Sequence, residues 1–145
     1  MRRFSRPRFR IADSAQQIVG GFLLAGPFVV TEEVWVLASN MGIVHALATV
    51  TIVFAIGYAT LYKADTNRDP DDEQTISGVP IRFISLMGVS FGSVLILALV
   101  FNAPETFLDG GETDAEVATI TLKAVSVGAV FSVVGAATAD SVFSR

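Results

Sequence analysis

The sequence contains no cysteine and a single histidine among its 145 residues. The absence of cysteine excludes disulfide bonds, thiolate catalysis and cysteine-ligated zinc or iron–sulfur sites. One histidine cannot form a multi-histidine metal site, and the serines show no recognisable arrangement of nucleophile and base. We therefore predict that the protein is not an enzyme and that it holds no metal or other cofactor.

Lysine is also scarce, because only Lys63 and Lys123 are lysines among the ten basic residues. Fourteen acidic residues give a formal net charge of -4. Excess surface charge of this kind keeps proteins soluble in high salt, so we predict a halophilic source. The short basic run at the N-terminus is explained by membrane topology and contact with anionic lipid, and nucleic acid is not a predicted partner.

Apolar residues are abundant, at 52% of the chain with a mean hydropathy of +0.59. A bilayer core about 30 Å thick requires about 20 helical residues, and four segments reach that length. The sequence therefore predicts an all-α polytopic membrane protein with four transmembrane helices, arranged as two antiparallel hairpins. The predicted spans are residues 18–37, 43–62, 83–101 and 117–138.

Nine of the ten basic residues fall in segments that would share one side of the membrane. The positive-inside rule then places both termini in the cytoplasm of a multi-pass protein of the plasma membrane. We divide the chain into a basic cytoplasmic N-terminus, a single membrane domain, and a cytoplasmic C-terminus. Their bounds are residues 1–14, 15–143 and 144–145, with a cytoplasmic loop at 63–82 and an acidic outer loop at 102–116.

Four ionisable residues fall in the predicted outer third of the membrane: Glu32, Glu33, His45 and Lys123. Isolated charges at that depth are costly, so we expect them to face the bundle interior and to pair, Lys123 with Glu32 or Glu33. Adjacent helical residues point about 100° apart, which leaves one carboxylate to bond His45, hold a proton or bind a cation. The alternative is a buried polar knot that only ties the helices together.

A proline lies within the first predicted span. Pro27 lacks a backbone N–H and frees the carbonyl of Leu23, so we predict a hinge there, with a routine proline bend as the alternative.

A second charged group is predicted at the inner edge, where Asp13, Arg82 and Asp140 end their helices at similar depth. Charges at helix ends reach the interface easily, so an interfacial salt bridge is favoured over a gate.

Small residues recur at a spacing of four in the last two spans. Gly88 with Gly92, and Ala124 with Gly128, would let helix backbones approach closely, either within one chain or between the chains of a homo-oligomer.

Three stretches of the chain resemble one family. They are QIVGGFLLAGPFVVTEEVW, ending at Trp35, VFAIGYATLY, and VPIRFISLMGVSFGS. The sequence resembles the integral membrane proteins grouped as domain of unknown function 2391. The resemblance implies a multi-pass membrane protein, often from a halophile, and supplies no known activity or binding residue.

Two functions remain as hypotheses for a protein embedded in the lipid bilayer. The first is an oligomeric ion or proton channel, transporter or sensor that uses Glu32, Glu33, His45 and Lys123. The alternative is a non-transporting structural or accessory subunit that docks a partner membrane protein.

Overall fold

The computed structural model describes residues 9–64 and 69–143 of the chain. The basic residues Arg2, Arg3, Arg6, Arg8, Arg68 and Arg145 lie outside the described residues. In chain order the elements are α1 (Ile11–Val29), α2 (Glu32–Asn40), α3 (Ile43–Tyr58), the π-helix η1 (Ala59–Ala64), the 3-10 helix η2 (Pro70–Asp72), β1 (Thr75–Ile76), β2 (Val79–Pro80), α4 (Ile81–Val100), α5 (Ala103–Phe107) and α6 (Asp114–Phe143). The two short strands form an antiparallel hairpin in the predicted cytoplasmic loop.

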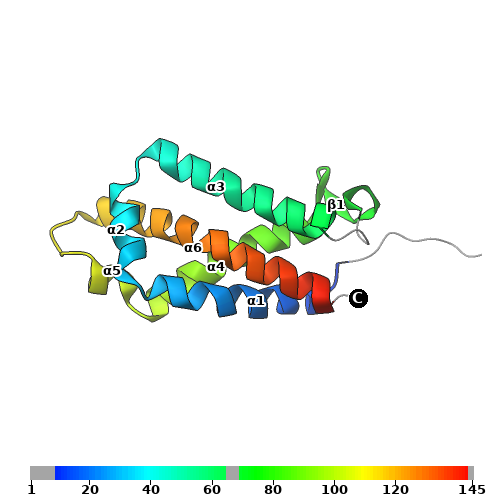
Figure 1. The fold of residues 1–145 in the computed structure, drawn as a ribbon, viewed down its shortest axis with the longest axis horizontal. Helices are drawn as coiled ribbons and strands as arrows, with labels where there is room; N and C mark the ends of the chain where they lie inside the picture. Colours follow the sequence, from blue (N-terminus) through cyan, green and yellow to red (C-terminus); the bar gives the residue numbers. More distant parts are fainter. Residues whose placement is uncertain (1–8, 65–68, 144–145) are drawn as a thin grey trace, which may run out of the picture.

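The long helices confirm the prediction of an all-α polytopic membrane fold. Three are long and apolar enough to cross a membrane, namely α3 continued by η1, α4, and α6, and the bent pair α1–α2 makes a fourth if it is one span. Gln16 of α1 donates a hydrogen bond to the carbonyl of Phe143, so both ends of the described chain meet. We call this the terminal end of the bundle, and the opposite end, with α2 and α5, the distal end (Figure 1).

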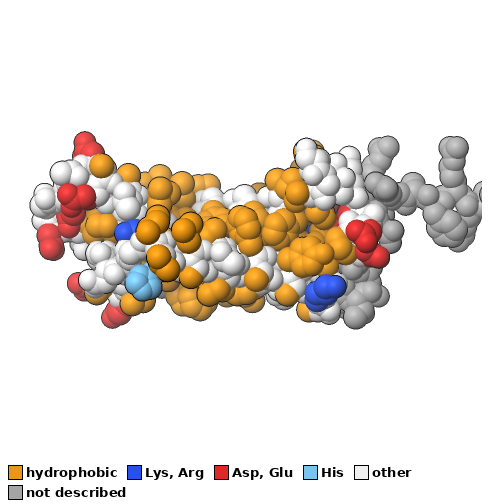
Figure 2. All heavy atoms as spheres, turned by 90° about the horizontal axis from the view of Figure 1, so that it is seen from above, with side chains coloured by type: hydrophobic (Ala, Val, Ile, Leu, Met, Phe, Trp, Pro, Cys, Tyr) orange, Lys and Arg blue, Asp and Glu red, His pale blue; other side chains and the backbone are white. Residues whose placement is uncertain are grey.

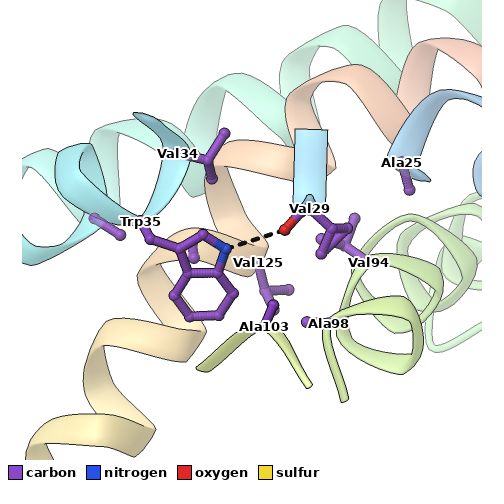
Figure 3. Packing of buried hydrophobic residues seen from close by; sticks show 10 residues of the cluster. Ala25, Val29, Val34, Trp35, Val94, Ala98, Ala103 and Val125 are labelled. Carbon is purple, nitrogen blue, oxygen red and sulfur yellow. Dashed lines mark hydrogen bonds between the residues drawn. The ribbon is translucent and has the colours of Figure 1, made fainter. Parts of the chain in front are cut away.

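The first predicted span is wrong as a single helix. The chain bends by 82° between α1 and α2, and the break follows Val29 while Pro27 stays inside α1. The bend therefore lies near Thr31 and not at Pro27, and the backbone N–H and hydroxyl of Thr31 both bond the carbonyl of Phe28. Trp35 holds the corner from the other side, because its indole N–H donates to the carbonyl of Val29 at 3.1 Å (Figure 3).

The bend decides how the helices are arranged. Because α2 turns away across the distal end, α1 packs against α6 and α4, while α3 packs mainly against α6. Figure 1 shows α6 lying between α3 and α1. The first two crossings are thus joined in sequence without forming a closely packed pair.

Small residues set the closest helix contacts. Gly20 of α1 meets the backbone of Gly135 in α6, and a Cβ on either residue would collide with the other helix. Gly128 packs against Val94, and Ala124 is buried. These two helix–helix contacts are intrachain.

The predicted pair Gly88 and Gly92 packs differently. A Cβ added at either residue would meet no atom within 4 Å, so this face of α4 is open in the single chain.

The exposed surface matches a membrane setting. Figure 2 shows apolar side chains covering the middle of the molecule, with carboxylates gathered at its two ends. The large exposed residues include Leu23, Leu47, Leu99 and Leu122, which belong to four different helices.

Candidate functional site

Three carboxylates converge on one guanidinium at the terminal end. Arg82 Nη1 lies 2.6 Å from Asp140 Oδ1, Nε lies 2.9 Å from Glu73 Oε2, and Nη2 lies 3.4 Å from Asp13 Oδ2. The hydroxyl of Tyr62 bonds the other oxygen of Glu73. We call these five residues the Arg82 network. All of them are buried, with Asp140 fully enclosed and Arg82 only 7% exposed.

Helix ends explain why these charges need one another. Asp13 sits in the first turn of α1, where a carboxylate is favoured, and it accepts the backbone N–H of Arg10 at 2.8 Å. Arg82 and Asp140 are each at the wrong end, since a cation opens α4 and an anion lies in the last turn of α6. Their direct pairing offsets both unfavourable helix-dipole interactions.

A neutral polar layer extends the Arg82 network into the bundle. Gln17 donates to the carbonyl of Arg82 at 3.4 Å and accepts the hydroxyl of Ser85 at 2.7 Å. Ser85 also lies 3.1 Å from the hydroxyl of Ser14. The ring of Phe9 covers the guanidinium, with its centroid 5.1 Å from Arg82 Cζ.

A separate polar contact, formed by Ser93, Ser132 and the backbone of Gly21, links three helices. The hydroxyls of Ser93 and Ser132 are 2.9 Å apart, and Ser132 donates to the carbonyl of Gly21. This contact joins α4, α6 and α1 without any charged group.

The structure does not assemble the predicted group at the distal end. Glu32 and Glu33 are exposed in the first turn of α2, and no ion pair joins either to Lys123 within residues 9–64 and 69–143. The ammonium of Lys123 instead donates to the carbonyl of Met41 at 2.6 Å. His45 is exposed, and its Nδ1 accepts the backbone N–H of Gly42.

Helix geometry explains this dispersal. The predicted depths assumed one straight helix from Ile18 to Leu37, whereas α2 is turned by 82° and opens with Glu32. Carboxylates in a first helical turn are stabilised by the helix dipole, so these two need no buried partner.

The structure does bring Asp13, Arg82 and Asp140 together, and it adds Glu73, Tyr62 and Gln17, which sequence reasoning missed. Gln17 follows Asp13 by four residues and shares its helix face, which is a signal available in the sequence. Glu73 and Tyr62 lie in a loop and a π-helix, whose positions no apolar period indicates. Among the described residues, no group of three or more His, Cys, Asp or Glu side chains has a metal-binding arrangement.

Comparison with protein families bears on the whole chain, since residues 5–142 match the family described as "Putative integral membrane protein (DUF2391)". The chain belongs to this family. The resemblance drawn from the sequence is thereby confirmed, together with a multi-pass location in a lipid bilayer. No curated protein and no solved structure matches the chain.

Proposed function

We propose that this member of the family is a proton-sensing membrane protein and that the Arg82 network is its sensing element. The observation that carries the proposal is the burial of three carboxylates around one guanidinium within an apolar bundle. Ionisable groups inside membrane domains are costly and are commonly retained for function.

Proton uptake has a direct structural consequence in this arrangement. A carboxylate that gains a proton loses its charge and its ion pair with Arg82, while the guanidinium keeps its charge. The groups that face one another are Arg10, Asp13, Tyr62, Glu73, Arg82 and Asp140. Acidification would therefore weaken the contacts that hold this end of the bundle together.

The Arg82 network also joins enough segments to transmit such a change. Its members come from α1, η1, the loop before β1, α4 and α6. One of these segments is a π-helix, and π-helical turns occur frequently at functional sites. Loss of one ion pair would thus alter how a loop and three long helices are held.

Packing beyond the Arg82 network favours sensing over conduction. Leu86, Val133 and Ala136 are fully buried in one apolar cluster. The hydroxyls of Ser93 and Ser132 hydrogen-bond each other. With the basic residues on the cytoplasmic side, the sensed compartment would be the cytoplasm.

The chain's lack of cysteine permits a direct test by spin labelling. Labels at Ile11 and Ile84 report on the terminal end, and labels at Leu37 and Leu122 report on the distal end. As the pH falls from about 5 toward about 1, the range in which ion-paired carboxylates of native proteins gain protons, we expect the first distance to change and the second to stay constant.

Variants tie the response to the Arg82 network. Asp140→Asn and Glu73→Gln each neutralise one buried carboxylate and should abolish or reduce the response, whereas exposed Glu33→Gln should retain it. Identical pH responses in all three variants would contradict the proposal. Proton flux through reconstituted liposomes would instead indicate transport.

A second candidate function is supported by the open face of α4. Gly88 and Gly92 have no neighbour within 4 Å of a Cβ position and lie between exposed Ile84 and Ile96. Such a face suits a partner helix in lipid, as in an accessory subunit. If the purified protein has a partner that Gly88→Leu releases, and if it shows no pH response, docking is the better description.

A further inference from the structure

A cleft of about 460 Å³ lies at the distal end, away from the Arg82 network. It is formed by the last turns of α4, by α5 and by the first turns of α6. Six of its lining residues carry the argument: Leu99, Glu105, Asp114, Val117, Thr121 and Leu122. A volume of this size is in the range of small-molecule sites.

One hydroxyl on the cleft lining has no hydrogen-bond partner among the described residues. Thr121 is 7% exposed, and within the described residues its side chain makes no hydrogen bond. Thr119 and Ser126 on the same helix donate to the carbonyls of Ala115 and Leu122, as is usual for such residues in helices. The Thr121 hydroxyl is thus left available on a cleft wall, where a ligand atom can bond it.

Charge in the cleft has one sign. Glu105 and Asp114 line it, are exposed, and form no ion pair with any described residue. The surrounding distal end carries seven carboxylates, and its single ammonium, Lys123, is bonded to the carbonyl of Met41. A concave surface of this kind concentrates cations and repels anions.

The remaining wall is apolar and reaches the lipid-facing surface. Leu99 and Leu122 line the cleft and are each 61% exposed. Asp114, Val117 and Thr121 follow one another at helical spacing on one face of α6, and Asp114 and Thr121 are about 10 Å apart along the axis. The cleft therefore runs from a carboxylate through apolar contacts to a hydroxyl.

From these features we infer that the distal cleft binds a cationic amphiphile. Its ammonium group lies between Glu105 and Asp114, its chain lies on Leu99 and Leu122, and a polar atom of the ligand bonds Thr121. Two sources share this chemistry, namely an amine-headed membrane lipid and a free amphiphilic amine. Because a lipid phosphate would be repelled by both carboxylates, the free amine is the better match.

The test uses octyltrimethylammonium with the whole protein in phosphatidylcholine nanodiscs. A cysteine in place of exposed Ala118, which lines the cleft, should be protected from a maleimide by this cation. A cysteine in place of Ala115, on the same helix but outside the cleft lining, should not be protected. Octyl sulfate and octyl glucoside have the same chain without the cation and should protect neither.

Three variants locate the interaction. The double change Glu105→Gln with Asp114→Asn should weaken protection by about tenfold or more, because a charge-assisted contact is lost. Thr121→Val should weaken protection by (8-hydroxyoctyl)trimethylammonium by about threefold to tenfold, as expected for one neutral hydrogen bond, and should leave protection by octyltrimethylammonium, which has no hydrogen-bonding atom, unchanged. The matched controls are Asp109→Asn in the same loop and Thr119→Val on the same helix, and both should bind normally.

The outcomes separate the alternatives. Equal protection by all three octyl compounds, or unchanged binding in the double variant, would overturn the inference in favour of a non-selective apolar groove. If nanodiscs containing phosphatidylethanolamine abolish binding of the free cation, the bound amphiphile is the lipid. If they leave binding intact, it is the free amine.

Discussion

The two ends of the bundle handle charge in opposite ways. At the terminal end, Asp13, Glu73 and Asp140 are buried and paired with Arg82. At the distal end, carboxylates such as Glu33 are exposed in helical first turns and in the loop before α6. Buried charges bind segments to one another, whereas exposed charges leave the local structure unchanged and shape the field around it. The proposed proton response therefore belongs to the terminal end, and the proposed cation binding to the distal end.

The largest effect should come from removing the one cation of the Arg82 network. Arg82→Met would leave buried carboxylates without their guanidinium and should reduce the free energy of unfolding by about 3–5 kcal/mol. Titration with sodium dodecyl sulfate, followed by circular dichroism in mixed micelles, measures the loss. Arg10→Met is the control, because that guanidinium is mostly exposed and 4.0 Å from Asp13. Equal losses in the two variants would show that burial of charge is not what distinguishes this end.

The sequence was sufficient for the long helices, because continuous apolar runs of bilayer length have few other structures available in lipid. Predicted spans 43–62 and 83–101 correspond to α3 with η1 (Ile43–Ala64) and to α4 (Ile81–Val100). The corner after Val29 could not be predicted in this way. It depends on tertiary bonds such as Trp35 to the Val29 carbonyl, which have no periodic signal.

The candidate site was predictable only where charges end neighbouring helices. Asp13, Arg82 and Asp140 could be brought together by counting depth along nearly straight segments. The same arithmetic failed for Glu33 and Lys123, because it crossed the 82° bend. Glu73 accepts a hydrogen bond from Arg82 while lying in a loop. The place of a loop residue depends on the tertiary fold, so the sequence pattern alone could not predict this contact.

A second test breaks the contact that holds α1 on α6. Gly20→Ala would drive a Cβ into the backbone of Gly135 and should cost about 1–3 kcal/mol through overpacking. Gly26→Ala, on the same helix with no atom within 4 Å, should leave stability unchanged or slightly improved. The detergent titration described above compares the two. If Gly26→Ala is the more damaging change, the close approach of α1 and α6 is not the basis of their packing.

The corner at the distal end should be less sensitive. Trp35→Phe keeps an aromatic ring beside Phe107 and removes the indole N–H that bonds the Val29 carbonyl. We expect a loss of about 1 kcal/mol, typical of one hydrogen bond. Unfolding titrations should detect it, with half-exposed Val36→Ala on the same helix as the control. A loss as large as that of Arg82→Met would make the corner a second organising centre.

A change at Lys123 in α6 extends the comparison between the two ends. Lys123→Met retains the aliphatic stem and loses one bond to the carbonyl of Met41, which is only half-buried and can be solvated instead. The expected cost is below about 1 kcal/mol. Unfolding of this variant at the level of Arg82→Met would restore the predicted polar knot between Lys123 and the glutamates.

The smallest effect is expected from Glu33→Gln, and it sharpens the comparison most because Glu73→Gln is the same chemical change at the other end. Glu33 is exposed and lacks an ion pair among the described residues, so its loss should leave the apparent melting temperature unchanged. Glu73 is 5% exposed and bonds both Arg82 and Tyr62, so Glu73→Gln should lower the apparent melting temperature measurably. Differential scanning fluorimetry of the two variants at one pH compares the ends directly. Because the two changes remove the same charge from chains of equal composition, any difference between them arises from where the carboxylate lies.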